Sequence, residues 1–231
     1  MKKKFNHVDD LDGLEVPERQ TVDGVGGKQR VYVTPEGNSY PSITSILGSQ
    51  PKPGLDEWRK RVGDAEANKV MKEASSIGTA VHDLCEKYLY NLPLNCNNQE
   101  AIKIFNRLRF LLGNVDNIVG LEVPLYSDQL KVAGTADCFA DYNGVFSVID
   151  FKTSKKPKKE EWIEDYFIQA YFYAVAFFER TGAIPEQVVI MIAVRDVFEV
   201  QVFKKSMDEL DTYIDKLIDI MKKQPQVIQI G

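Results

Sequence analysis

The stretch KVAGTADCFADYNGVFSVIDFKT, residues Lys131–Thr153, decides the fold, because it contains two largely apolar runs separated by Asn143-Gly144. An Asn-Gly pair favours the two-residue turn of a β-hairpin, in which both turn residues take positive φ angles. We therefore expect antiparallel strands over Lys131–Asp141 and Val145–Thr153, with the residues that flank the turn opposite each other.

Charged residues occur where these strands are otherwise apolar. Asp150 and Lys152 are two residues apart and so share one face of the second strand. The expected register places Asp137 opposite Asp150 and Thr135 opposite Lys152, and Gly134 would leave room for a ligand backbone. Two carboxylates opposite each other repel, which predicts a divalent cation between them. The alternatives are that Asp150 and Lys152 form a salt-bridged strand end and that Asp137 is a solvated edge residue. A longer turn would shift the register by one or two residues.

Outside this hairpin, the periodicity predicts helices before it and further helices and strands after it. The expected elements are a strand over Gln29–Val33, a short helix from Tyr40 to Leu47, a helical region from Trp58 to Asn91 with a break near Ser75, a helix over Gln99–Leu112, a strand over Val119–Leu125, a helix over Glu160–Arg180, strands over Gln187–Val194 and Val197–Phe203, and a helix over Met207–Lys223. This order indicates an α/β fold with a mixed sheet. We expect a polar hairpin segment at 1–39 and a single domain at 40–231, divided into a helical elaboration at 40–112 and a core at 113–231.

Two of the predicted helices carry polar residues beside an apolar stripe. Gly78 and His82 lie one turn apart on a face next to the stripe that contains Val81. A neutral imidazole there suits a metal ion, and a glycine allows a substrate strand to approach closely, although a histidine with structural partners is the simpler interpretation. Gln169 and Tyr173 share one face of an almost entirely apolar helix, so Gln169 either braces the backbone or reaches a ligand phosphate.

The glycine-rich stretch at 23–28 resembles a phosphate-binding loop but lacks its pattern. That pattern requires glycine and serine or threonine where this chain has Val22 and Gln29. A hairpin, followed by a second turn at 35–38, is the better interpretation. Ser42 and Thr44 then begin the short helix, where their hydroxyls could cap it or hold a phosphate.

Composition limits the functional classes. The chain has 231 residues, 27% of them charged and 44% hydrophobic, which is too short for a protein that carries its own helicase motor. Its formal net charge of −5 means that any bound polyanion must be met by local basic patches. No apolar run approaches the roughly 18 residues of a membrane helix, and no signal sequence is recognisable. We expect a soluble, cytoplasmic, unprocessed protein without a membrane partner.

The metal-ligating residue types point to a hard ion. Three cysteines, Cys85, Cys96 and Cys138, have no paired spacing, so neither a disulfide framework nor a four-cysteine cluster is expected. Only two histidines are present, which excludes a multi-histidine site. Carboxylates must therefore dominate any metal site.

Four motifs occur together in a recognisable order. The motifs are His82 on a helix, Gly134-Thr135-Ala136-Asp137, Asp150-Phe151-Lys152 and Gln169-Ala170-Tyr171-Phe172-Tyr173. Together they resemble the motifs of the PD-(D/E)XK nuclease superfamily in its RecB-like branch. Within that branch, the chain is similar to exonucleases of phages and to the mitochondrial genome maintenance exonuclease. This similarity lies in the segment at 40–47, in Trp58 and in the residues from Gly78 to His82. The resemblance spans about Tyr40 to Phe203 and implies a restriction-endonuclease-like core.

The resemblance implies a DNA exonuclease that uses Mg²⁺ or Mn²⁺ and carries no iron–sulfur cluster. Its catalytic residues would be Asp137, Asp150, Lys152 and His82. The metal ligands would be His82, Asp137, Asp150 and the Phe151 carbonyl, with Glu122 as an additional acidic ligand. Lys152 would orient or deprotonate the attacking water or offset charge in the transition state. The substrate-binding residues would be Gln169, Tyr173, Thr135, Gly78, Ser42 and Thr44.

Two basic patches are candidates for the DNA path. One comprises Trp58, Arg59, Lys60 and Arg61, and the other lies at 155–159 and includes Lys155 and Lys156. Solvated faces are the usual role of such runs, but the second patch directly follows the catalytic strand. Trp58 could stack on a base of a single strand or belong to the core. The first 39 residues and the helices before Gly78 could form an arch that holds a single strand.

The expected substrate is single-stranded DNA or DNA with single-stranded ends, in replication, recombination or repair, with proteins of those processes as possible partners. A phage or bacterial origin fits this role. The alternatives are a structure-specific endonuclease with the same site, a non-catalytic accessory protein that only binds DNA, and a phosphodiesterase that acts on RNA or small molecules. Unpaired buried charges argue against the accessory protein, because a dead site would have no reason to keep them.

Overall fold

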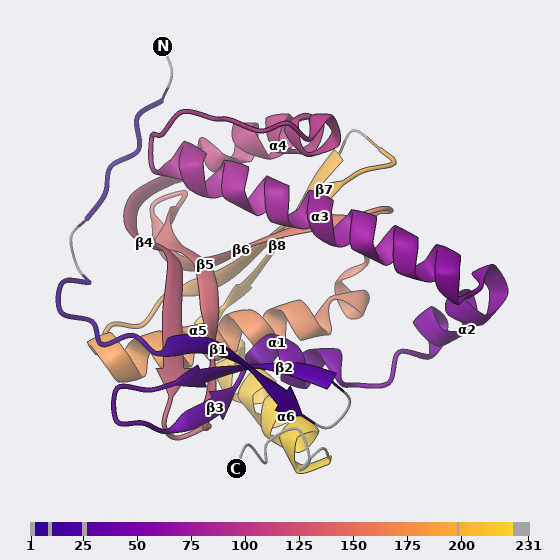
Figure 1. Ribbon diagram of the computed structural model, residues 1–231. Coiled ribbons are helices and arrows are strands. Elements are labelled where there is room, and N and C mark those ends of the chain that lie inside the picture. Colours follow the sequence, from indigo (N-terminus) through magenta and orange to yellow (C-terminus); the bar gives the residue numbers. More distant parts are fainter. Residues whose placement is uncertain (1–2, 9–10, 25–26, 198, 224–231) are drawn as a thin grey trace.

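The computed structural model describes residues 3–8, 11–24, 27–197 and 199–223 (Figure 1). Their helices and strands, in chain order, are β1 (Glu18–Gly24), β2 (Gly27–Val33), β3 (Ser39–Pro41), α1 (Ile43–Gly48), α2 (Pro53–Val62), α3 (Asp64–Leu89), α4 (Gln99–Leu112), β4 (Val115–Ser127), β5 (Val132–Tyr142), β6 (Val145–Ser154), the 3₁₀ turn η1 (Glu160–Trp162), α5 (Glu164–Thr181), β7 (Gln187–Val194), β8 (Glu199–Ser206), the 3₁₀ turn η2 (Met207–Glu209) and α6 (Leu210–Lys223).

The central sheet is mixed, as the order of elements predicts. Its strands lie in the order β4-β5-β6-β7-β8, and only β6 and β7 are parallel. The crossover between those two strands is α5, because a parallel connection needs a long return segment. The fold class is therefore α/β with one five-stranded mixed sheet flanked by helices.

Helices cover both faces of this sheet and divide the core into two. On one face, α3 and α4 pack through residues such as Val81 and Leu108. On the other face, α1, α5 and α6 pack through residues such as Ile43, Phe172 and Leu217. Figure 1 shows the two helical layers above and below the sheet. A strand that is buried on both faces has a nearly continuous run of apolar residues. This burial explains why β7 and the part of β6 before Asp150 are largely apolar.

A second, three-stranded sheet lies beside the central one. It has the order β1-β2-β3, and all its pairs are antiparallel. The predicted hairpin is therefore confirmed, although its turn at 25–26 lies outside the described residues. A bridge between Ser42 and Ala133 and a buried cluster of Tyr32, Tyr40, Tyr126 and Ala133 attach this small sheet to β5.

The Asn143-Gly144 turn and its register are confirmed over half of the hairpin. Both turn residues have positive φ, at 54° and 77°, and Tyr142 pairs with Val145. Regular pairing continues to Cys138 and Ile149 and ends there, one pair before the expected juxtaposition of the two aspartates. Instead, the Phe151 amide donates a hydrogen bond of 2.8 Å to Oδ2 of Asp137. The carboxylate thus replaces the backbone partner at the point where the strands separate.

Several boundaries differ from the expectation. The short helix expected from Tyr40 begins at Ile43, because Tyr40 and Pro41 pair with β2 as part of β3. The helix expected from Trp58 begins at Pro53.

The break near Ser75 is wrong: α3 is continuous there, and the break falls at Gly63, whose φ of 85° suits glycine. β4 begins at Val115 rather than Val119, because an irregularity between Asp116 and Gly120 disrupts the alternation that identifies a strand. The helices expected at 160 and 207 each begin with a 3₁₀ turn.

Within the described residues, no helix combines the length and the hydropathy needed to cross a bilayer.

Candidate active site

A cavity of about 530 Å³ opens between the two sheets and α3. Most of the predicted site residues line it, together with four residues that were not predicted. The lining residues are Arg19, Arg30, Tyr32, Ser42, Thr44, Gly78, Thr79, His82, Glu122, Thr135, Asp137, Lys152, Gln169 and Tyr173. The lining residues thus come from eight helices and strands, together with Ser42 just before α1, although these segments are distant in the sequence.

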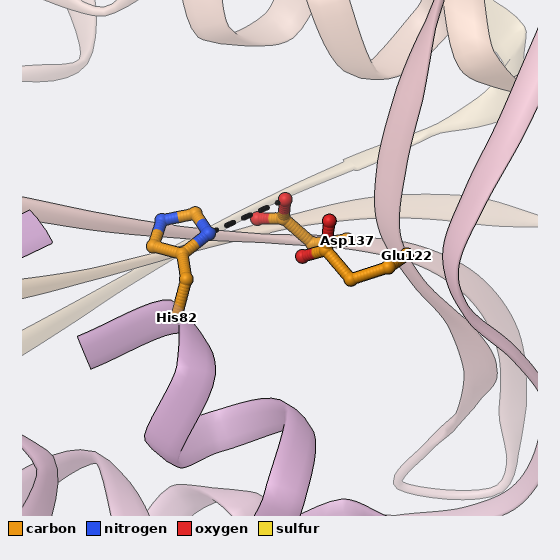
Figure 2. Close-up of side chains that lie close together, drawn as sticks. All are labelled: His82, Glu122 and Asp137. Carbon is orange, nitrogen blue, oxygen red and sulfur yellow. Dashed lines mark ion pairs between the residues drawn. The ribbon is translucent and has the colours of Figure 1, made fainter. Parts of the chain in front are cut away.

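Three of these side chains could hold a metal ion. His82, Glu122 and Asp137 each place one ligand atom within 4.8 Å of the others. Nδ1 of His82 lies 3.4 Å from Oδ1 of Asp137. Figure 2 shows the imidazole reaching from α3 toward the two carboxylates, which come from neighbouring strands. The resulting set of one nitrogen and two carboxylates suits a hard or borderline divalent ion.

Local structure explains how each of the three side chains reaches this point. Val81 and Leu84 are buried against the sheet, which turns His82 to the rim of the cavity. Glu122 has a φ of 49°, an uncommon angle for a residue other than glycine, and regular pairing of β4 skips it. Such a distortion redirects a side chain, and this one belongs to the candidate ligand set.

Asp150 and Lys152 form a second group next to this triad. Asp150 is 1% exposed, and Nζ of Lys152 lies 2.5 Å from its Oδ2. Among the described residues, neither carboxylate oxygen of Asp150 accepts a hydrogen bond of regular geometry. Buried carboxylates normally have several partners, so these oxygens retain the capacity to bind a cation. Asp150 lies outside the triad, which differs from the expectation that it faces Asp137 directly.

The charges of the site shift one another's pKa values. Burial acts against the imidazolium, but the Asp137 carboxylate outweighs it and raises the pKa of His82 to about 9. Burial raises the pKa of Asp150 to about 6 despite the adjacent Lys152. Desolvation and Asp137 raise the pKa of Glu122 to about 7. Burial also acts to raise the pKa of Asp137, but His82 and Lys152 hold it below its usual range. Clustered shifts of this size are typical of functional sites.

Neutral polar groups line the rest of the cavity in pairs. Nε2 of Gln169 donates to the Tyr173 hydroxyl at 3.2 Å, as their spacing of one helical turn suggests. The hydroxyl of Tyr32 lies 3.1 Å from that of Thr135. The Ser42 hydroxyl occupies the N-cap position of α1 yet contacts the Thr44 hydroxyl, at 2.8 Å, instead of capping the helix.

Gly134 does not leave room for a ligand, which corrects the expectation. A Cβ atom there would lie 2.9 Å from both Ile43 and Tyr173 side-chain atoms. The glycine is therefore required by the close packing of α1 and α5 on β5. Gly78 is different, because a Cβ would meet only Oγ1 of Thr153 at 3.7 Å and the residue lines the cavity.

The predicted basic patches do not line the cavity. Arg59 on α2 contacts Asp64 at 2.5 Å and Asn68 at 2.6 Å, so it braces α2 against α3. Lys60 and Arg61 on α2 and Lys155 and Lys156 after β6 are exposed, and Trp58 is half-buried. The Phe151 carbonyl remains a predicted ligand, because Phe151 contacts the site through its amide, which donates to Asp137, and through its ring, which lies edge-on to the imidazole of His82.

Sequence reasoning missed Thr79, which adjoins Gly78, and Arg19, Arg30 and Tyr32 of the β1–β2 hairpin. The alternation along the two short strands was a usable signal, since Arg30 and Tyr32 are two residues apart and share a face. However, no local pattern indicated that this hairpin packs over the carboxylates. That placement depends on contacts between the two sheets.

Known proteins that are similar to part of the chain include nucleases, whereas no family model matches it. The mitochondrial genome maintenance exonuclease 1 of Mus musculus is 28% identical over 131 residues, which cover 52% of this chain and 39% of that protein. The human protein of the same name is 29% identical over 132 residues, or 52% and 38% of the two chains. An ATP-dependent helicase/nuclease protein of Clostridium beijerinckii is 30% identical over 126 residues, or 51% and 9%. The partial relatives thus support a nuclease family.

Proposed function

We propose that this protein is a metal-dependent DNA exonuclease of the PD-(D/E)XK superfamily, in its RecB-like branch. The observation that carries the proposal is the meeting of His82, Glu122 and Asp137 with the Asp150–Lys152 pair at one cavity. The names of the partial relatives point to the same activity. Because the matched segment spans about two fifths of the mouse exonuclease, the substrates and partners of the whole protein are part of this proposal.

The donor set fits Mg²⁺ or Mn²⁺. His82, Glu122, Asp137 and Asp150 would hold the ion, and the buried Asp150 carboxylate, whose partner is the Lys152 ammonium, gives it a further anionic ligand. A bound divalent ion polarises a phosphoryl oxygen and lowers the pKa of a coordinated water. Cys85, Cys96 and Cys138 are not among the residues that line the cavity, and burial raises the pKa of Cys85 and Cys138.

The other residues of the cavity would bind and orient the substrate. As an ammonium, Lys152 would offset negative charge that develops on the phosphoryl oxygens, and only as the neutral amine would it accept the proton of the attacking water. Burial acts to lower the pKa of Lys152, but its neighbour Asp150 raises it, which favours the first role. Gln169, Tyr173, Thr135, Ser42 and Thr44 would position the backbone by hydrogen bonds. Gly78 would allow a strand to pass close to α3. We further propose single-stranded or tailed DNA as the substrate, in replication, recombination or repair.

The test is hydrolysis of end-labelled linear single-stranded DNA beside its circular counterpart, with Mg²⁺, Mn²⁺ or EDTA. We expect loss of the linear strand only, abolished by EDTA and lowered at least about 100-fold by Lys152→Ala. Lys103→Ala is the matched control, because Lys103 is an exposed lysine on α4. Cleavage of the circle would instead indicate an endonuclease. DNA binding by folded wild type without cleavage would refute the enzyme.

Because Lys152→Ala leaves the buried Asp150 without its counter-ion, the variant could fail to fold. Mn²⁺ binding measured by calorimetry provides a second readout. We expect Asp137→Asn to weaken it by at least about tenfold, and Asp211→Asn on the surface of α6 to leave it unchanged. Equal affinities of the two variants would contradict the proposed ligand set.

A further inference from the structure

The β1–β2 hairpin presents a polar face to the candidate active site. Arg19 pairs with Tyr32 and Thr21 pairs with Arg30, so these four side chains alternate onto one face. Arg19, Arg30 and Tyr32 of this face line the cavity. The intervening Val31, on the opposite face of β2, is 1% exposed. The hairpin thus forms a wall of the cavity opposite the strands that carry the carboxylates.

This wall is held in place by packing. Tyr32 is 1% exposed, and its hydroxyl contacts Thr135 on β5. The backbone amide of Ser42 donates to the Arg30 carbonyl at 3.2 Å, next to the bridge between Ser42 and Ala133. Arg30 therefore lies on a segment that is fixed to the central sheet, and Arg19 is fixed through its pairing with Tyr32.

The two guanidinium groups form no short ion pair within the described part of the chain. Both arginines are exposed, and among the described residues neither lies within ion-pair distance of a carboxylate. Burial raises the pKa of Glu122, and the charge of Arg19 acts on that carboxyl group from a greater distance to lower it. In contrast, Arg59 and Arg180 each contact an aspartate. Two exposed cations beside the cavity therefore keep their hydrogen-bond donors available for an anion, in a chain whose net charge is −5.

The opposite side of the cavity mixes acidic and basic groups. Glu122 and Asp137 line it together with His82 and Lys152, and Lys152 is paired with the buried Asp150. Because these opposite charges largely offset one another, this side offers a polyanion little net attraction. A substrate with several phosphates therefore gains from further cations beside the metal site.

We infer that Arg19 and Arg30 bind the phosphodiester backbone of the nucleic acid next to the phosphate that is cleaved. The planar guanidinium matches phosphate oxygens in a bidentate manner, and contacts to the backbone are independent of base sequence. The ligand class is therefore the sugar-phosphate backbone of a polynucleotide. This inference rests on the proposed function for the position of the cleaved phosphate, but not for the anion-binding wall itself.

The experiment uses the full chain and fluorescently labelled oligothymidine. Binding is measured in EDTA over a range of salt concentrations, and cleavage is measured separately with Mg²⁺. We expect Arg19→Gln/Arg30→Gln to weaken binding by about tenfold and to reduce the slope of log K against log salt by about 1.4, or about 0.7 for each lost phosphate contact. KM should rise while kcat changes less than about threefold.

Two controls make the result specific. Arg109→Gln removes an exposed arginine from α4, outside the cavity, and should change none of these quantities. Arg19→Lys/Arg30→Lys should restore the salt slope, because it restores the charge. If the glutamine variant matches Arg109→Gln, the inference is overturned. If wild type binds but never cleaves, the proposed function fails, and the salt slopes still decide the inference.

Discussion

At the residue scale, His82 couples the candidate metal-ligand triad to pH through its charge. Its Nδ1 lies 3.4 Å from Asp137, and this neighbour raises its pKa from 6.5 to about 9 against the effect of burial. In the metal-free protein, the folded state therefore holds a proton on His82 that the unfolded chain loses. Metal binding requires the neutral imidazole, so it must release this proton.

The stability of the metal-free protein should consequently fall as pH rises through this window. A raised pKa means that the stabilisation by the His82–Asp137 pair is complete below pH 6.5 and is lost toward pH 9. Asp150, with a pKa of about 6, completes most of its titration before this window, whereas Glu122, with a pKa of about 7, titrates inside it and adds to the fall. We expect the free energy of unfolding in EDTA to decrease by at least about 2 kcal/mol between about pH 6.5 and about pH 8.5, with most of the decrease due to His82.

Urea unfolding in EDTA at these two pH values measures this difference. His82→Gln is the control, because it keeps a polar side chain and removes the titration. Its stability should vary much less across the same window. A wild-type stability that is flat, or that falls equally in the variant, would show that the His82–Asp137 pair does not carry the effect.

At the scale of the element, α3 contains a glycine, Gly78, that lowers the stability of the helix but lines the cavity. It is a helix of 26 residues with Gly78 in its interior, where glycine costs about 0.5–1 kcal/mol relative to alanine. No packing contact requires the glycine, since a Cβ would lie 3.7 Å from Oγ1 of Thr153. The residue lines the cavity instead, so its smallness serves whatever enters the site.

Gly78→Ala should therefore stabilise the fold and impair the activity. We expect a gain of about 0.5–1 kcal/mol in the free energy of unfolding, together with a several-fold loss of kcat/KM on single-stranded DNA. Ser76→Ala, two residues away at an exposed position of the same helix, should not reduce activity. Unchanged cleavage by Gly78→Ala would mean that the substrate does not pass close to α3.

At the scale of the whole molecule, α2 and the first half of α3 form a projecting arm (Figure 1). α2 has no buried residue, and Ala67 is the only buried residue of α3 before Ile77. Because little apolar surface of the arm is packed on the core, its sequence is free to serve binding. Arg59 braces its two helices, which leaves Lys60 and Arg61 as the exposed cations at the end of α2.

Charge reversal tests whether this arm holds the DNA. Lys60→Glu/Arg61→Glu should leave the free energy of unfolding within about 0.5 kcal/mol of wild type and weaken single-strand binding by about tenfold or more. Lys222→Glu/Lys223→Glu makes the same charge change on α6 and should have little effect. Equal weakening by both variants would show a response to net charge alone, without a contact at the arm.

The mixed sheet could be predicted from the sequence because its signals are local. The Asn143-Gly144 turn sets the register of β5 and β6, and the long apolar run of β7 marks a strand buried on both faces. The positions of Asp150 and Lys152 on one face follow from the period of a strand, and the two side chains do form an ion pair. The break at Gly63 was missed because the serine pair at 75–76 also favours a chain break, whereas the positive φ of Gly63 is visible only in the structure.

The sequence by itself determined the kinds of chemistry available: few histidines, no paired cysteines, and carboxylates with a lysine at the ends of two adjacent strands. Only the tertiary structure decided which of these groups meet. It brought Glu122 to His82 and Asp137 through a distorted residue in β4, and it placed Arg19 and Arg30 over the same cavity. The physical reason is the distance along the chain over which each interaction acts. Turn geometry and strand period act between neighbouring residues, whereas the cavity depends on how two sheets and a helix pack against one another.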